Sequence, residues 1–96
     1  MFDHKIDAAD KRVMYRDLAS ALRGLVTGEP DPIANMANAA ALIWETLPGL
    51  NWAGFYRNLG GELVAVLDLD SPDLARFDAE DEAGCTAIAA ILAGVL

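Results

Sequence analysis

LGGELVAVLDLDSP, residues 59–72, decides the fold, because it combines a turn, an apolar strand and a second turn. Gly60 and Gly61 are typical of a hairpin turn, and the run ELVAVLDLD at 62–70 is typical of a strand. The Val and Leu residues of this run predict that both faces near its middle are covered. Asp68 and Asp70 are disfavoured in strands, and their spacing of two places both carboxylates on one face. The stretch therefore predicts a strand that ends in paired acids.

The sequence just before this turn predicts the partner strand. In NWAGFY, residues 51–56, Trp52 and Tyr56 share one face and Phe55 points to the other. If the two strands pair as a hairpin, the two aromatic rings and the two carboxylates line one pocket with an apolar wall and an anionic floor. Such carboxylates bind an ammonium group, so we expect a small zwitterion with an apolar tail. Two other interpretations stay open: a solvated strand end that leads into a turn, and a one-residue slip that separates the aromatic and acidic residues.

Three further segments show helical periodicity. Residues 10–26 place Met14, Leu18, Leu22 and Leu25 on one face. Asp31 before Pro32 predicts the N-cap of a second helix that ends near residue 47. Asp78 predicts the N-cap of a third helix, with acids in its positive first turn. The predicted buried stripes are Ile33, Met36, Ala37, Ala40, Ala41, Trp44 and Leu47 in the second helix, and Cys85, Ile88, Leu92 and Val95 in the third.

The predicted order of elements is helix, helix, strand, strand, helix. This order predicts an α/β protein of the α+β type, in which an antiparallel β-hairpin packs with three helices in a single domain, residues 1–96. Two strands by themselves form a marginal sheet. We therefore expect the helices to cover it, or strands of another chain to add at its open edges, which makes a homodimer an expected form.

Composition excludes several classes of function. Fifteen acidic residues against seven basic ones give a formal charge of −8, so we expect no nucleic acid and no membrane as a partner. No apolar run approaches a membrane span, the N-terminus lacks the apolar region of a secretory signal, and the single cysteine fits a reducing compartment, so we expect a cytoplasmic protein. His4 is the only histidine, and neither a catalytic triad nor a metal-ligating cluster is predicted. Cys85 is interpreted as a small buried apolar residue.

Two parts of the sequence together resemble a known family. NWAGFY, preceded by a helix of the ALIWETLPGL type and followed by VAVLDLDSPDLARFDAEDEAG, resembles the free methionine-(R)-sulfoxide reductases, which have the GAF fold. The resemblance extends over most of the chain from about Leu18 onward. It implies a pocket for free methionine sulfoxide, in which Trp52 and Tyr56 surround the methyl sulfoxide end and Asp68 and Asp70 bind the amino group. It also implies thiol chemistry without a bound cofactor, completed by a thioredoxin-type reductant.

The sequence departs from this family in its middle. In the family, further strands and loops follow the first hairpin turn and hold the catalytic and resolving cysteines. Cys85 lies in the C-terminal helix and does not replace them, so no catalytic residue is predicted. LGGELVAVLDLDSP resembles two similar family segments joined by an internal deletion. We therefore expect a truncated GAF-like domain that is inactive as a reductase by itself. The alternatives are a non-catalytic small-molecule-binding or dimerisation module, and the remnant of a damaged gene.

Overall fold

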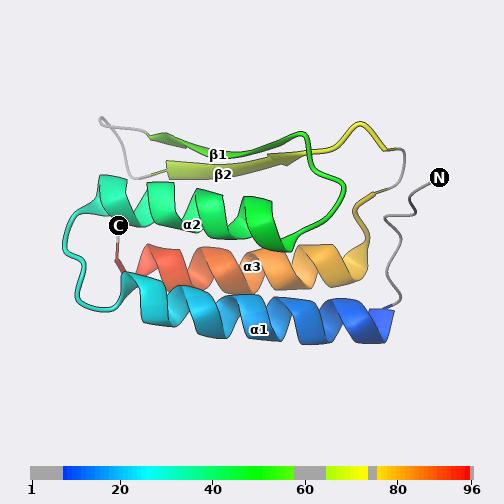
Figure 1. Ribbon diagram of the computed structural model, residues 1–96, viewed down its shortest axis with the longest axis horizontal. Helices are drawn as coiled ribbons and strands as arrows, with labels where there is room; N and C mark the ends of the chain where they lie inside the picture. The colour runs from blue at the N-terminus through cyan, green and yellow to red at the C-terminus, as the bar shows by residue number, and fades with distance from the viewer. Residues whose placement is uncertain (1–7, 58–64, 74–75, 96) are drawn as a thin grey trace.

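The computed structural model describes residues 8–57, 65–73 and 76–95. Three helices and two strands follow one another as α1 Ala8–Val26, α2 Pro32–Thr46, β1 Trp52–Arg57, β2 Ala65–Asp70 and α3 Ala79–Ala93. The strands lie along one side of the molecule, and α1 lies along the opposite side (Figure 1). This arrangement confirms the predicted α+β fold, with a two-stranded antiparallel sheet beside three helices. No helix in the described part of the chain is long and apolar enough to cross a membrane.

The register of the sheet sorts its residues onto two faces. Trp52 pairs with Asp70, and Tyr56 pairs with Val66. Between these pairs, Gly54 lies opposite Asp68 on the same, outer face. The other face consists of Ala53, Phe55, Leu67 and Leu69, which pack against the helical core. The slipped register, which would have separated the aromatic residues from the acids, is therefore absent. The predicted turn at 59–61 and the predicted strand residues 62–64 lie outside the described residues.

Side-chain caps start two of the helices where the sequence predicts them. Asp31 has an extended backbone, and its carboxylate accepts a hydrogen bond of 3.0 Å from the backbone N–H of Ile33. Pro32 occupies the first turn, where its missing N–H costs nothing. Asp78 begins α3 through a capping box, in which it accepts from the backbone N–H of Asp81 while the Asp81 carboxylate accepts from the backbone N–H of Asp78. Both predicted N-caps are confirmed.

The core lies between the helices, and it corrects two predicted stripes. In α1, Leu18 and Leu22 are buried as predicted, but Leu25 is 42% exposed and Val26 is buried instead. In α2, the exposed face contains Ile33, Ala37, Ala41 and Trp44, all of which were predicted to be buried. The buried face contains Asn35, Met36, Ala39 and Ile43. In α3, Ile88 and Leu92 are buried as predicted, and Cys85 and Val95 are half-buried.

The prediction of the buried residues of α2 was wrong for a physical reason. Residues 32–44 contain no charged side chain, so little in the sequence marks which side of this helix meets water. The buried face includes a polar residue, Asn35, whose side-chain amide donates a hydrogen bond of 3.0 Å to the backbone carbonyl of Glu29. Asn35 thereby holds the turn between α1 and α2 against the start of α2.

Candidate functional site

The candidate site is the outer face of the sheet, on the side away from the helical core. Trp52 is 46% exposed and Tyr56 is 61% exposed, so both rings are accessible. Asp70 is exposed and Asp68 is half-buried. The register places all four side chains on this face, with Trp52 directly opposite Asp70. The structure thus brings together the four residues that the sequence predicts as a site.

The absence of a side chain at Gly54 lets the indole ring of Trp52 lie close against its own strand. A Cβ atom added at Gly54 would lie 2.8 Å from Cζ2 and 3.1 Å from Cε2 of Trp52, closer than van der Waals contact allows. The ring therefore covers the position where any other residue would place a side chain. As a result, the indole forms an apolar surface beside Asp68, which pairs with Gly54 across the sheet.

Two contacts fix the end of β2 beside the start of β1. The backbone N–H of Asn51 donates a hydrogen bond of 2.9 Å to the carbonyl of Asp70. The hydroxyl of Ser71 donates to the carbonyl of Gly49 in the turn before β1. The backbone of Asp70 is therefore held next to Trp52. The end of β2 is not free, and the carboxylate of Asp70 stays near the aromatic ring.

The two carboxylates influence each other. Partial desolvation, together with a hydrogen bond and charge repulsion from Asp70, raises the pKa of Asp68 above the ordinary value of an aspartate. The repulsion between two neighbouring carboxylates is reduced when one of them gains a proton or when a cation binds to both. The pair is therefore suited to an ammonium group, which would lie against the adjacent aromatic surface.

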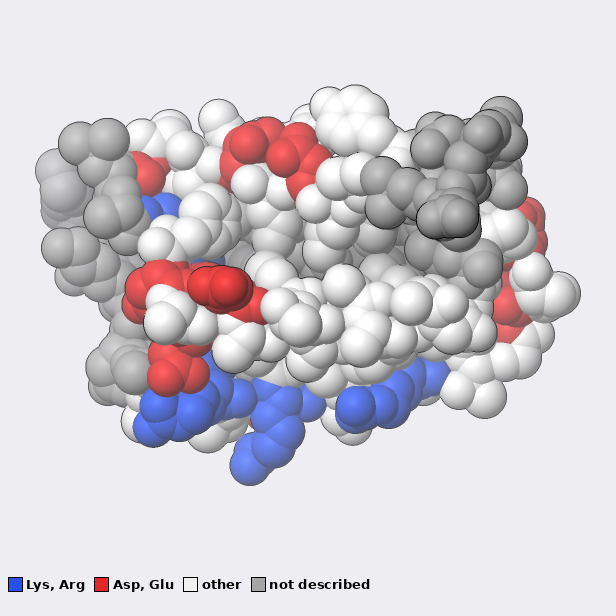
Figure 2. Space-filling model, turned by 180° about the vertical axis from the view of Figure 1, so that it is seen from behind, with Lys and Arg blue, Asp and Glu red and all other residues white. Residues whose placement is uncertain are grey.

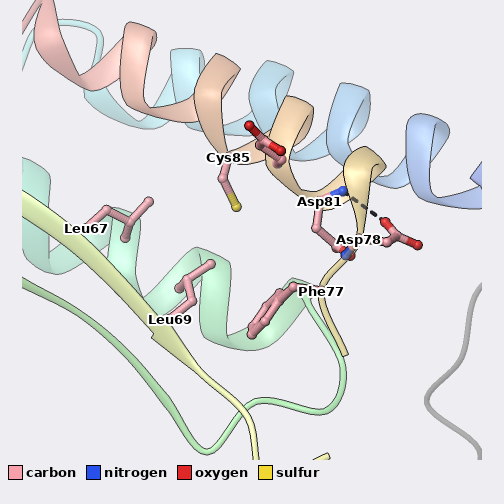
Figure 3. Close-up of a pocket in the computed structure, with 7 residues that line it drawn as sticks. Leu67, Leu69, Phe77, Asp78, Asp81 and Cys85 are labelled. Atoms are coloured by element: carbon pink, nitrogen blue, oxygen red, sulfur yellow. Dashed lines mark hydrogen bonds between the residues drawn. The ribbon is translucent and has the colours of Figure 1, made fainter. Parts of the chain in front are cut away.

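Apart from the outer face, a cavity lies on the helical side of the sheet, between β2 and α3. It has a volume of about 440 Å³, and its lining consists of Leu67, Leu69, Phe77 and Cys85 together with the acidic residues Asp78, Asp81 and Glu82. Figure 3 shows the Cys85 sulfur pointing into this cavity. Leu67 and Leu69, which line the cavity, lie on the inner face of the sheet, whereas Trp52 and Asp70 lie on its outer face. Burial raises the pKa of the Cys85 thiol, which makes it less ionised and a weaker nucleophile. Cys85 is therefore neither activated nor placed near the outer face.

A buried charge cluster supports the site and was not predicted from the sequence. Asp81 is only 1% exposed, and its carboxylate accepts hydrogen bonds from Lys11 at 2.6 Å, Tyr15 at 2.7 Å and Arg76 at 3.2 Å. Burial by itself raises the pKa of Asp81, but the hydrogen bonds from these three side chains and from the backbone of Asp78 outweigh burial, so its pKa is well below the usual range. Arg76 also donates to the backbone carbonyl of Pro48 at 2.8 Å. The cluster therefore joins α1, α3 and the turn that leads into β1.

Only part of this cluster has a signal in the sequence. The capping pattern at residues 78–81 predicts that Asp81 lies near the helix start, but as a residue of an exposed first turn. Lys11 and Asp81 are separated by 70 residues, so their pairing depends on how α1 packs against α3. Gly84 permits that packing, because a Cβ atom there would lie 2.2 Å from the Tyr15 ring.

No family model matches the chain. Three known proteins that are similar to it bear on its fold and function. Protein ZMO0507 of Zymomonas mobilis is 30% identical over 156 aligned residues, which cover 96% of this chain and 97% of that protein. The free methionine-R-sulfoxide reductase of Escherichia coli is 43% identical over 47 residues, which cover 49% of this chain but only 28% of the reductase. A crystal structure of a protein described as a GAF sensor from Burkholderia vietnamiensis has a TM-score of 0.84 and 28% identity, and the match covers 88% of this chain and 94% of that one.

Proposed function

This chain belongs to the same family as Protein ZMO0507 and has the GAF fold. From that premise, we propose that it is a non-catalytic module. Its proposed ligand is free methionine sulfoxide or a closely similar zwitterion. The observation that carries the proposal is the position of Trp52 directly opposite Asp70 on an accessible face. The ammonium group of the ligand contacts Asp68 and Asp70, and its sulfur-bearing tail lies on Trp52 and Tyr56.

The proposed absence of turnover rests on where the only thiol lies. Reduction of a sulfoxide requires an activated thiolate in contact with the ligand sulfur. Cys85 is the only cysteine of the chain, and its side chain points into the cavity on the helical side of the sheet. Because burial raises the pKa of its thiol, Cys85 lacks both the position and the ionisation that this chemistry needs. The partial match to the E. coli reductase supports a shared ligand class, and it extends to only 28% of that enzyme.

We also propose that the chain is an internally shortened GAF domain. The alignment with Protein ZMO0507 extends over 156 residues and includes nearly all of both proteins, yet this chain has 96 residues. The extra residues of the relative therefore fall inside the alignment. The TM-score of 0.84 to the Burkholderia GAF sensor supports a chain that keeps the fold, in preference to the remnant of a damaged gene.

Binding and turnover can be separated in one set of measurements. Titration calorimetry of the full chain with L-methionine (R)-S-oxide is expected to give a dissociation constant on the order of 1 mM, because the site is open on one side. Asp70→Asn is expected to weaken binding roughly tenfold, the loss of one charge-assisted hydrogen bond. Trp52→Ala weakens it as well, whereas the control Phe77→Ala, which changes the cavity on the helical side, leaves it unchanged.

The opposite pattern would refute the proposal. Loss of binding in Phe77→Ala but not in Trp52→Ala would place the ligand in the cavity between β2 and α3. Turnover of the sulfoxide in the presence of dithiothreitol, abolished by Cys85→Ser, would instead make the chain an enzyme.

A further inference from the structure

Arg76 is buried, whereas the arginines of α1 lie at the surface. Figure 2 shows basic side chains along the lower border of the molecule, where α1 lies, and the side chains of Arg12 and Arg16 on this helix are 60% and 73% exposed. The side chain of Arg76 is only 4% exposed. Burial of a charged group costs free energy unless the group is paired and hydrogen-bonded. The contacts of Arg76 therefore show what its buried position achieves.

The guanidinium group of Arg76 joins two parts of the fold. Its Nη1 donates a hydrogen bond of 3.2 Å to Oδ1 of Asp81, and its Nε donates one of 2.8 Å to the backbone carbonyl of Pro48. The centroid of the Phe77 ring lies 5.2 Å from Cζ of Arg76. Because the guanidinium group is planar and rigid, these contacts fix the position of Pro48 relative to Asp81.

Stability alone does not explain why Arg76 is buried. Its third terminal nitrogen, Nη2, is also buried and has no hydrogen-bond partner among the described residues. A buried donor without an acceptor lowers the stability of the folded state. The position of Arg76 is therefore better explained by the turn that it holds.

This turn, residues 48–51, leads directly into the candidate site. The backbone N–H of Asn51 donates to the carbonyl of Asp70, which joins the turn to the end of β2. The bond from Arg76 to the turn adds a connection to α3, because Arg76 is also bonded to Asp81. The start of β1 is thus held both to β2 and to the buried cluster.

We propose that Arg76 is a positioning residue of the outer face. It does not contact the ligand. Through Pro48 it fixes the turn, and thereby holds the Trp52 ring beside the carboxylate of Asp70. This inference rests on the proposed function, in which these two groups bind the two ends of one ligand. If the turn shifts relative to the end of β2, both ends of the ligand can no longer be bound together, so affinity falls although neither contacting residue is changed.

Two matched variants separate positioning from stability. Arg76→Lys keeps a positive charge beside Asp81 but loses the planar group that reaches Pro48 at the same time. Tyr15→Phe removes a hydrogen bond of 2.7 Å to the same oxygen of Asp81 and leaves the bond to Pro48 in place. We expect both variants to lower the midpoint of urea unfolding, and only Arg76→Lys to change the outer face.

Amide hydrogen exchange of the full chain, followed by NMR, tests the position of the turn without a ligand. The N–H of Asn51 is protected by its bond to Asp70, and Leu22, fully buried in α1, serves as the reference for global unfolding. Relative to Leu22, Asn51 is expected to exchange about tenfold faster in Arg76→Lys and at the native rate in Tyr15→Phe. Arg76→Met, which keeps the apolar part of the side chain, is a second variant with the same expectation as Arg76→Lys.

Ligand affinity is measured on the same proteins. Titration with L-methionine (R)-S-oxide, followed by the indole N–H signal of Trp52, is expected to give a dissociation constant about tenfold higher in the Arg76 variants and unchanged in Tyr15→Phe.

The proposal is overturned if the exchange of Asn51 relative to Leu22 is unchanged in the Arg76 variants, or if Tyr15→Phe accelerates it equally. It is also overturned if Asn51 exchanges faster in the Arg76 variants while they bind the ligand as tightly as the native chain. A native chain that does not bind methionine sulfoxide refutes the proposed function, and the exchange of Asn51 still decides whether Arg76 holds the turn.

Discussion

Trp52 and Asp70 face each other across the two strands of the sheet, at the point where β1 begins and β2 ends. Their backbones are fixed together there by the hydrogen bond from Asn51 to the carbonyl of Asp70. In the proposed function, this aromatic ring and this carboxylate bind a ligand that is cationic at one end and apolar at the other.

Gly54 is expected to control the position of the Trp52 ring. In Gly54→Ala, the new methyl group would overlap the indole, which must rotate away because it is the far end of a flexible side chain. We expect little change in the free energy of unfolding, about 1 kcal/mol or less, but weaker binding of methionine sulfoxide and a changed tryptophan emission. Calorimetric titration and denaturant unfolding separate the two effects. Unchanged affinity in a folded variant would show that the ring position is irrelevant.

Ligand binding is expected to depend on pH through Asp68. Because the pKa of Asp68 is raised, this carboxylate gains a proton at a higher pH than an ordinary aspartate, whose pKa is about 3.9. The neutral form attracts an ammonium group less strongly, so affinity falls as the pH is lowered through the raised pKa. Asp68→Asn removes this titrating carboxylate, so its affinity is expected to change less than that of the native chain as the pH is lowered. Titrations between pH 3.5 and 8 test this, and identical pH profiles for the two proteins would contradict it.

Asp81→Asn is expected to destabilise the fold strongly. The change leaves Lys11 and Arg76 buried without their common counter-charge, a loss of about 3–5 kcal/mol out of a total of about 5–15 kcal/mol. The surface pair of Arg12 and Glu80 provides the control, and Glu80→Gln is expected to cost about 1 kcal/mol or less. Urea unfolding at pH 7 measures both variants. Equal losses would mean that the buried cluster contributes no more than a surface pair.

The same cluster predicts how stability changes with acid. The folded-state pKa of Asp81 is below its unfolded value, so its contribution is present above about pH 3.9 and is lost as the pH falls toward the folded-state pKa. The native chain should therefore lose stability below about pH 4 more steeply than Asp81→Asn. Urea midpoints from pH 7 to pH 2.5 test this prediction. A parallel decline in both proteins would assign the acid sensitivity to other carboxylates.

Two helical glycines should respond in opposite ways to the same substitution. In Gly84→Ala, the added methyl group would lie 2.2 Å from the Tyr15 ring, so α1 and α3 must separate, at a cost of about 1–3 kcal/mol. In Gly24→Ala nothing lies within 4 Å of the new atom, and the better helix former should stabilise the protein by about 0.5–1 kcal/mol. Thermal unfolding compares the two. Stabilisation by both substitutions would mean that the contact between Gly84 and Tyr15 is not tight.

The hairpin could be predicted from sequence because strand geometry is local. A period of two places Trp52 and Tyr56 on one face, and the same rule places Asp68 and Asp70 on one face of the next strand. Only the register between the strands remained open, and the structure has the register that joins the two sets. The helix caps at Asp31 and Asp78 were equally predictable, since each depends on residues within one turn.

Two features depended on packing between distant segments and were not predicted. The buried side of α2 includes Asn35, while the larger Ile33 and Trp44 remain exposed, which reverses what hydrophobicity favours. The burial of Asp81 required Lys11, from the other end of the chain, as a partner. Charged residues are rarely buried without such partners, so a sequence pattern that treats each residue separately assigns them to the surface.

The most direct test of the central claim is a map of where the ligand binds. In heteronuclear NMR spectra of the full chain, titration with L-methionine (R)-S-oxide is expected to shift the indole N–H signal of Trp52 and the backbone signals of Asp68 and Asp70. Cys85 and Phe77, on the helical side of the sheet, should remain unchanged. Shifts confined to Cys85 and Phe77, or no shifts at about 50 mM ligand, well above the expected millimolar dissociation constant, would contradict the claim that the outer face is the binding site.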